Sequence, residues 1–264
     1  MSPPAVPEPF YWISSPCGLV LRCRPLDDIA PHLFTTRDAL LSSTEGWWRL
    51  GDAVGAERVA TLDQVHGRDV VAVAPGAAPP SGRPKADALV SSDPSVAIAV
   101  RAADCVPLLL ADRRTGAVAA VHAGWRGTAA GVAAAAVEAL QCGLGVKPRD
   151  LVAAIGPTIG ACCYEVGRDV ADAFAAAGHA PHLRERWFVG RDPGPGIRDP
   201  EELRLDLVAA NRDQLVLAGV PEAQIHACGL CTAMHLDVLT SYRAEKEKAG
   251  RIAAAIRCRE YNPA

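Results

Sequence analysis

The chain has 264 residues, of which 50% are hydrophobic and 22% are charged, and its formal net charge at pH 7 is −3. This is the composition of a globular protein with one large or two small domains, which needs neither disulfides nor a metal to fold. The slight acidic excess argues against a nucleic-acid partner, and no apolar run approaches the ~18 residues of a membrane helix.

The cysteines and the start of the chain indicate the cellular setting. The first residues are rich in proline and have no basic residue, which is unlike a secretory signal. An odd number of cysteines, nine, then favours a reducing, cytoplasmic setting with free thiols, including the adjacent Cys162 and Cys163. Cys228 and Cys231 form a CxxC, but no second CxxC exists to complete a four-thiolate zinc site.

Short apolar runs separated by turns predict the strands. The first segment, residues 1–58, shows no clear pattern, and we expect the core to begin at residue 59, within one domain. The predicted strands are residues 70–73, 88–90, 97–100, 106–110, 117–121, 151–155 and 224–227. Two of them, 97–100 and 106–110, are continuously apolar, which suits strands buried on both faces.

Helices are expected between these strands. Thr128 is a candidate cap for an alanine-rich helix that runs to Gln141. Further helices are predicted over residues 166–176, 203–217 and 245–259, the last one broken near Gly250, with a loop over 181–200. Residues 106–121 form a predicted hairpin, and this mixture of hairpins and strand–helix units indicates an α+β fold.

The stretch from His122 to Gly127 is the most informative part of the sequence. It places a potential metal ligand, His122, at a strand end and a fixed positive charge, Arg126, beside a predicted helix start. Helix starts attract anions, because their backbone N–H groups are unpaired. A glycine-rich turn with an incidental histidine is the alternative interpretation.

Two further residues are candidate ligands at strand ends or turns, His66 and Cys105. Two imidazoles and one thiolate match Zn²⁺, and three protein ligands leave a fourth position for water or substrate. Zinc lowers the pKa of bound water toward about 7. The hairpin places Cys105 opposite His122, but local geometry does not place His66.

Six motifs in order resemble the YfiH family, also called the polyphenol oxidase laccase-domain or peptidoglycan-editing-factor family. The match covers roughly residues 59–252. The motifs are residues 63–67 (DQVHG), 86–90 (ADALV), 101–109 (RAADCVPLL), 121–127 (VHAGWRG), 155–157 (IGP) with 163–166 (CYEV), and 241–243 (SYR) with 250–251 (GR).

The resemblance implies an αββα layered fold with mixed sheets and one metal bound by His66, Cys105 and His122. It also implies phosphorolysis of adenosine, inosine and methylthioadenosine, and deamination of adenosine. The substrates would then be a purine nucleoside and phosphate, and Zn²⁺ the metal, with Cu²⁺ as the alternative. We assign catalysis to the three ligands and to Arg126, which would hold the phosphate; the oligomeric state is left open.

Other polar residues are further candidates, and two carboxylates among them have two interpretations each. Asp87 and Asp104 either orient a ligand or are turn carboxylates, and Tyr164 is a candidate pocket residue. Lys246, Lys248 and Arg251 are expected to form a solvated helical face.

Three other functions stay open. A copper-dependent phenol oxidase would need several coppers, and the chain has no His-x-His pair to hold a cluster. A metal-free cysteine hydrolase would use Cys105 as nucleophile and His122 as base, which fits an editing role on peptidoglycan precursors. In a non-catalytic binding protein, the metal would only brace the fold.

Overall fold

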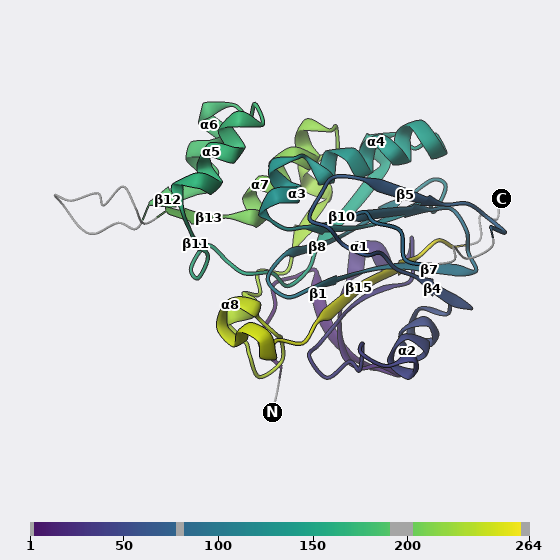
Figure 1. The fold of residues 1–264 in the computed structure, drawn as a ribbon. Coiled ribbons are helices and arrows are strands. Elements are labelled where there is room, and N and C mark those ends of the chain that lie inside the picture. The colour runs from purple at the N-terminus through teal and green to yellow at the C-terminus, as the bar shows by residue number, and fades with distance from the viewer. Residues whose placement is uncertain (1–2, 78–81, 191–202, 260–264) are drawn as a thin grey trace.

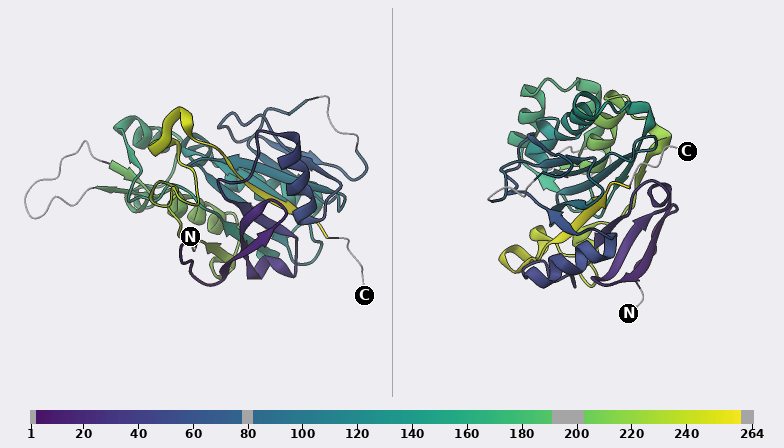
Figure 2. Two further views of the ribbon diagram at one scale, coloured as in Figure 1. Left: turned by 90° about the horizontal axis from the view of Figure 1, so that it is seen from below. Right: turned by 90° about the vertical axis from the view of Figure 1, so that its right-hand side faces the viewer.

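Two sheets packed face to face form the centre of the molecule. The computed structural model describes residues 3–77, 82–190 and 203–259. Helices cover the outer face of each six-stranded sheet, so the layers follow the order α, β, β, α (Figures 1 and 2). The α+β class and the layered arrangement predicted from the sequence are confirmed.

The first sheet has the strand order β1-β2-β3-β15-β7-β4 and therefore joins the start of the chain to its end. Its strands are β1 (Phe10–Ser15), β2 (Gly18–Cys23), β3 (His32–Thr35), β4 (Arg58–Ala60), β7 (Val96–Ala102) and β15 (Ile252–Arg257). Only β4 runs parallel to its neighbour, β7. The N-terminal segment thus contributes three neighbouring strands, β1, β2 and β3, to the same sheet as β7 and β15.

The second sheet has the order β14-β10-β8-β9-β6-β5. Its strands are β5 (Val70–Val73), β6 (Ala88–Ser91), β8 (Val106–Asp112), β9 (Val118–Ala123), β10 (Leu151–Ile155) and β14 (Ile225–Ala227). A small third sheet consists of β11 (Glu165–Val166), β12 (Phe188–Gly190) and β13 (Leu203–Leu205).

Helices α3, α4 and α7 lie on the second sheet, and α2 lies on the first (Figure 1). The helices are α1 (Arg24–Asp27), α2 (Thr44–Val54), α3 (Trp125–Ala129), α4 (Val132–Leu144), α5 (Arg168–Ala176), α6 (Pro181–Trp187), α7 (Leu207–Leu217) and α8 (Tyr242–Glu245), with 3₁₀ turns at Pro148–Asp150, Glu222–Gln224, Thr232–Met234 and Lys246–Lys248. No helix among the described residues is both long and apolar enough to cross a bilayer.

Alternation along the central strands explains the three layers of core. In β8, Leu108 and Leu110 pack toward the helices, whereas Leu109 packs toward the first sheet. In β7, Ile98 faces the second sheet and Ala99 faces α2. Because successive side chains point to opposite faces, a strand covered on both faces must be apolar throughout. The continuous apolar runs predicted to be such strands are confirmed.

Two segments that were predicted to be helical are strands in the structure. Residues 252–257, expected to be helical, form β15, which pairs with β3 and β7 and is buried on both faces. Its alanines favour a helix by propensity, but burial between two strands outweighs that preference. Residues 203–205 are strand rather than helix, because Asp206 caps α7 by accepting from the Ala209 N–H.

The predicted loop over 181–200 and the predicted cap at Thr128 are also wrong for the described residues. Residues 181–187 form α6, which has proline at its first position, and β12 follows; the rest of that loop prediction lies outside the described residues. Gly124, not Thr128, precedes the first helix after β9. Thr128 lies buried inside α3, where its hydroxyl accepts a hydrogen bond from the Asn211 amide at 3.0 Å.

Candidate metal centre and active site

The β8–β9 hairpin brings Cys105 and His122 together. Val106 pairs with Ala123, and Pro107 pairs with His122 across the antiparallel strands. Cys105 directly precedes β8, so it lies at the same end of the hairpin as His122. The sequence-based hairpin and the proximity of these two residues are confirmed.

His66 reaches the same place on a loop that Asp87 holds. The backbone N–H groups of Val65, His66 and Gly67 all donate to the Asp87 carboxylate, at 3.2, 3.0 and 2.6 Å. His66 has a φ of 61°, a left-handed conformation uncommon outside glycine. The fully buried carboxylate of Asp87 therefore fixes a loop conformation that would otherwise be disfavoured.

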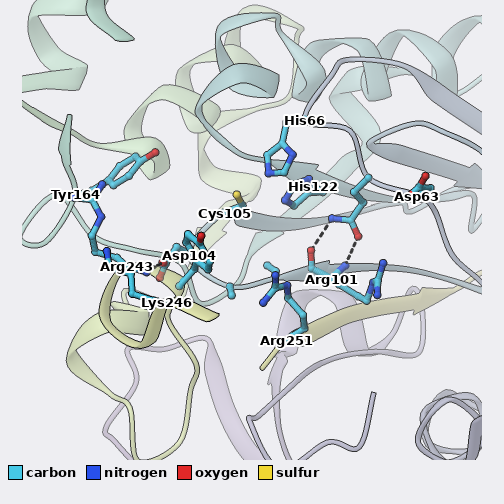
Figure 3. A pocket seen from close by; sticks show the side chains of 14 residues that line it. Asp63, His66, Arg101, Asp104, Cys105, His122, Tyr164, Arg243, Lys246 and Arg251 are labelled. Carbon is cyan, nitrogen blue, oxygen red and sulfur yellow. Dashed lines mark hydrogen bonds between the residues drawn. The ribbon is translucent and has the colours of Figure 1, made fainter. Parts of the chain in front are cut away.

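The three candidate ligands converge. One ligand atom from each of His66, Cys105 and His122 lies within 4.8 Å of the others. The two imidazole rings meet edge to face, with centroids 4.9 Å apart and planes at 78°. Figure 3 shows the three side chains facing one another. A tetrahedral zinc ion with bonds of about 2.0–2.3 Å requires ligand atoms about 3.3–3.8 Å apart, so only a small adjustment separates this arrangement from one that holds the ion.

Asp87 also orients the second imidazole. Its Oδ1 lies 2.8 Å from Nδ1 of the buried His122. An imidazole that donates from Nδ1 to a carboxylate keeps its Nε2 lone pair free for a metal. One carboxylate thus positions both histidines, and its role is to orient ligands rather than to cap an exposed turn.

Two glycines in the 122–127 stretch make room for the cluster. A Cβ on Gly124 would lie 2.8 Å from Sγ of Cys105 and 3.0 Å from Cδ2 of His66. A Cβ on Gly127 would lie 2.9 Å from the Gly67 carbonyl oxygen. These positions require glycine because the His66 loop packs directly against the turn after β9.

Asp104 ties Cys105 to the segments on the other side of the site. Its Oδ1 accepts from the Thr232 hydroxyl at 2.6 Å, and its Oδ2 accepts from the Arg243 N–H at 2.6 Å. Its carbonyl oxygen accepts from the Thr158 hydroxyl at 2.6 Å. Asp104 is buried and has a φ of 84°, so it is a connecting residue and not an exposed turn carboxylate.

The electrostatics of the cluster favour a charged pair. Burial raises the pKa of the Cys105 thiol, but hydrogen bonds and charge from His122 and His66 outweigh it and lower this pKa to about 6. Burial likewise lowers the pKa of His122, and the partners Asp87 and Cys105 raise it to about 9. Without a metal, Cys105 is therefore a thiolate beside an imidazolium at neutral pH.

A cavity of about 660 Å³ opens beside the cluster. Four basic residues line it, and the sequence-based reasoning assigned none of them to the site: Arg101, Arg243, Lys246 and Arg251. Figure 3 shows Arg101 and Arg251 on one side of the cluster, and Tyr164 and Arg243 on the other. Lys246 and Lys248 are exposed on a 3₁₀ helix, as predicted for a solvated helical face. Arg251 is not part of that helix, because the chain after Gly250 enters β15 beside β7.

Arg101 is positioned by its backbone rather than by its side chain. The Gln64 side chain bonds to both the N–H and the carbonyl of Arg101, at 2.8 and 2.7 Å. The Nε of Arg101 is buried and has no hydrogen-bond partner among the described residues. Burial lowers the pKa of Arg101, and the charges of Arg83 and Arg251 lower it further. These features are typical of a cationic subsite for an anion.

Of the two remaining candidates from the sequence, Tyr164 lines the cavity and Arg126 does not. The Arg126 guanidinium lies 4.3 Å from the Trp125 ring centroid and is exposed, and Arg126 is not among the residues that line the cavity. Tyr164 lines it, with Arg243 5.2 Å from its ring centroid. Burial and the nearby Cys105 thiolate raise the pKa of Tyr164 to about 12, so its hydroxyl keeps its proton at neutral pH.

Comparisons with known proteins identify the family of the chain. Residues 34–259 match the family model described as "Multi-copper polyphenol oxidoreductase laccase". A "Purine nucleoside phosphorylase" of Deinococcus radiodurans is 38% identical over 247 residues, covering 86% of this chain and 88% of the relative. The crystal structure of the Bacillus licheniformis hypothetical protein YfiH matches with a TM-score of 0.81 at 28% identity, covering 96% of this chain and 100% of that chain.

Two other relatives match over shorter stretches. A "Purine nucleoside phosphorylase" of Bacteroides thetaiotaomicron is 37% identical over 172 residues, or 64% of this chain and 60% of the relative's length. "Adenosine deaminase RL5", from an unknown prokaryotic organism, is 44% identical over 139 residues, or 53% of this chain and 49% of its own length. The chain belongs to the laccase-domain (YfiH/YlmD) family of enzymes, as its motifs indicated.

Proposed function

We propose that the chain is a zinc-dependent purine nucleoside phosphorylase with adenosine deamination as a second activity. One observation carries this proposal: His66, Cys105 and His122 converge at a cavity lined by four basic residues. A volume of about 660 Å³ lies in the range of small-molecule sites. The names of the D. radiodurans relative and of RL5 support the two reactions.

His66, Cys105 and His122 would hold the ion, and their donor set suits zinc better than a hard cation. When bound, zinc would supply a Lewis acid at the cavity floor. Asp87 keeps Nε2 of His122 available, and Gly124 leaves the space between the ligands open. Oxygen-liganded cations such as Mg²⁺ would find no carboxylate in this ligand group.

Phosphate would bind to Arg101 and Arg251, which lie at the same end of the neighbouring strands β7 and β15. The Nε of Arg101 is buried and has no hydrogen-bond partner among the described residues, so a bound anion would supply the acceptor that it lacks. Arg126, which we assigned to the phosphate from its place near a helix start, is the competing candidate. Its exposure and its stacking on Trp125 favour Arg101.

In phosphorolysis, a phosphate oxygen forms a bond to C1′ of the ribose, and the bond from C1′ to the purine N9 breaks. The bonding electrons leave with the purine, which takes up a proton. Tyr164 is protonated at neutral pH and lies at the cavity wall, so we assign it the hydrogen bond to the departing base. In deamination, water would add to the purine carbon that carries the amino group, and ammonia would leave.

Product analysis on the purified, zinc-loaded protein tests this function. With inosine in phosphate buffer we expect hypoxanthine and ribose 1-phosphate, and with adenosine also inosine. Cys105→Ala is expected to lower both rates by more than about 100-fold, whereas Cys142→Ala, at an exposed thiol on α4, leaves them unchanged. An intact inosine pool with zinc-loaded wild type rejects the proposal.

The thiolate–imidazolium pair supports one second candidate, a metal-free cysteine hydrolase that edits peptidoglycan precursors. Cys105, with its pKa of about 6, is poised as a nucleophile, and His122 would act as its acid and base. A chelator separates the two functions: the hydrolase activity would survive metal removal, and the zinc-dependent one would not.

A copper-dependent phenol oxidase, which the family's description suggests, has less support. His66 and His122 are the only imidazoles in the ligand groups among the described residues, and a multicopper cluster needs more. Metal analysis of protein produced without added copper, followed by a phenol oxidation assay, tests this alternative.

A further inference from the structure

A second group of potential ligands lies apart from the first. The sulfur atoms of Cys162, Cys163 and Cys231 lie within 4.8 Å of one another. Cys162 is exposed, Cys163 is half-buried and Cys231 is buried. Nothing in the proposed reaction uses these thiols. The adjacent pair and Cys231 are far apart in the sequence, with 67 residues between Cys163 and Cys231.

Tertiary contacts, rather than chance proximity on a loop, bring the third thiol to the pair. The Gly160 N–H donates to Sγ of Cys231 at 3.2 Å. Cys231 also forms a parallel bridge with Thr158, three residues after the end of β10. After Gly160 the chain makes a tight turn, in which the N–H groups of Cys163 and Tyr164 both donate to the Gly160 carbonyl.

The CxxC itself is not the functional unit. Cys228 lies in the core between the two sheets, whereas Cys231 faces the helix side with Cys163. The CxxC spacing therefore suggests Cys228 as the partner of Cys231, whereas in the fold the thiols near Cys231 are those of Cys162 and Cys163.

The distances suit a small thiophilic ion. Metal–sulfur bonds of about 2.3 Å place sulfur atoms about 3.8–4.0 Å apart in tetrahedral or trigonal geometry. The Cys162 and Cys163 sulfurs are 3.5 Å apart, and no sulfur is more than 4.8 Å from another. Thiolates select soft ions, and no fourth His, Cys, Asp or Glu joins the group among the described residues.

We propose that Cys162, Cys163 and Cys231 form a second metal site, which binds one monovalent copper ion through three thiolates. A structural zinc ion would want a fourth ligand, whereas Cu⁺ is satisfied by three sulfurs. The ion reaches the site through the exposed Cys162. Once bound, it ties the turn that carries Tyr164 to the segment after β14. This proposal does not depend on the proposed function.

Anaerobic titration with Cu⁺, in competition with a chromophoric Cu⁺ chelator, tests the site on the full chain. At the Cu⁺ concentrations set by the chelator, we expect wild type to bind one equivalent of Cu⁺ more than Cys162→Ser or Cys231→Ser. The affinity of either variant for this additional Cu⁺ ion should be lowered by more than about 100-fold. Cys142→Ser is the matched control, because this exposed thiol on α4 has no thiol partner in the group. It should bind as many equivalents as wild type.

Two further measurements keep the result independent of folding. X-ray absorption of the loaded Cys105→Ala variant, which lacks the thiol of the first cluster, should give three sulfurs at one copper. Alkylation followed by mass spectrometry should show Cys162, Cys163 and Cys231 protected by one equivalent of Cu⁺, and Cys142 unprotected. Equal copper binding by Cys162→Ser, or zinc bound by the three thiols in preference to copper, overturns the proposal.

Discussion

The two candidate ligand clusters differ in how the fold builds them. His66, Cys105 and His122 are held by a fully buried carboxylate, Asp87, which bonds to three backbone N–H groups and one imidazole. Among the residues that the structure describes, the three thiols at 162, 163 and 231 have the Gly160 N–H alone in a comparable role. The first cluster is thus preorganised and opens onto a cavity. The second cluster lies on a turn and has fewer hydrogen bonds that fix its geometry.

The two clusters therefore differ in what the binding of a metal ion would do. A ligand set fixed before the ion arrives keeps its geometry when substrate binds, which a catalytic site requires. A set that closes around its ion instead stabilises the local fold. We therefore expect that substitutions of the residues that position His66, Cys105 and His122 lower activity more than substitutions of exposed residues do.

The largest effect is expected from removing that support. Asp87→Ala would leave three backbone N–H groups and Nδ1 of His122 without partners in a buried site. We expect a loss of about 3–5 kcal/mol in the free energy of unfolding and zinc binding weakened by about 10- to 100-fold. Urea unfolding and competition with a zinc chelator measure the two quantities.

Asp52→Ala is the matched control, because Asp52 is an exposed carboxylate on α2. Its stability should stay within about 0.5 kcal/mol of wild type. If Asp87→Ala behaved like this control, the first cluster would be no more preorganised than the second.

The space between the ligands is the next test. In Gly124→Ala the new methyl group would lie 2.8 Å from Sγ of Cys105 and displace one ligand. We expect phosphorolysis to fall by about 100-fold, in line with the cost of a 1 Å misplacement at a reacting centre. Gly143→Ala, in α4 with no atom within 4 Å of the new Cβ, should keep full activity and gain up to about 1 kcal/mol of stability. Equal rates for the two variants would mean that the cluster tolerates the displacement.

The cavity wall gives a smaller effect. Arg101→Ala is expected to raise the KM for phosphate by about 10- to 150-fold, the cost of losing a charge-assisted hydrogen bond of ~1.5–3 kcal/mol. Arg126→Ala removes an equal charge from an exposed, stacked position and should change this KM less than about twofold. Steady-state kinetics with varied phosphate measure the KM of both variants. A larger increase in KM for Arg126→Ala than for Arg101→Ala would assign phosphate binding to Arg126 at the helix start.

The sequence predicted the parts of the site that neighbouring residues determine. The 106–121 hairpin follows from two apolar runs and a turn, so the pairing of Cys105 with His122 could be foreseen. The position of His66 could not, because it depends on a bond between its loop and Asp87, 21 residues further on. The family resemblance, not the spacing, added His66 to the ligand set.

The cationic wall of the cavity was missed for a related reason. Residues 252–257 have the alanine content of a helix, so Arg251 was placed on a solvated helical face. In the fold they form the strand between β3 and β7, which puts Arg251 near Arg101 at the cavity. A better signal was present in the two isoleucines that flank three alanines, Ile252 and Ile256, since β-branched residues favour strands.

The smallest expected effect compares His122 with a buried histidine that has no carboxylate partner. His32 accepts from the Cys23 N–H at Nε2, at 2.9 Å, and its Nδ1 lies 3.0 Å from the Ala30 carbonyl oxygen, so it is neutral. Burial lowers the pKa of His32 to about 4, from about 6.5 in the unfolded chain. Below pH 6.5 the unfolded chain takes up a proton that the folded chain refuses, so stability is lost as the pH falls toward 4.

This linkage amounts to about 1–2 kcal/mol between pH 7 and pH 5 for one histidine. Urea unfolding of the metal-free protein at the two values measures it. His32→Gln removes the titration and should lower the pH dependence by that amount, whatever its effect on stability at pH 7. His122 has the opposite sign: its pKa is raised to about 9, so its protonation stabilises the metal-free fold at pH 7 and below. An unchanged pH dependence in His32→Gln would mean that the buried His32 titrates as in the unfolded chain, and then burial alone would not distinguish the two histidines.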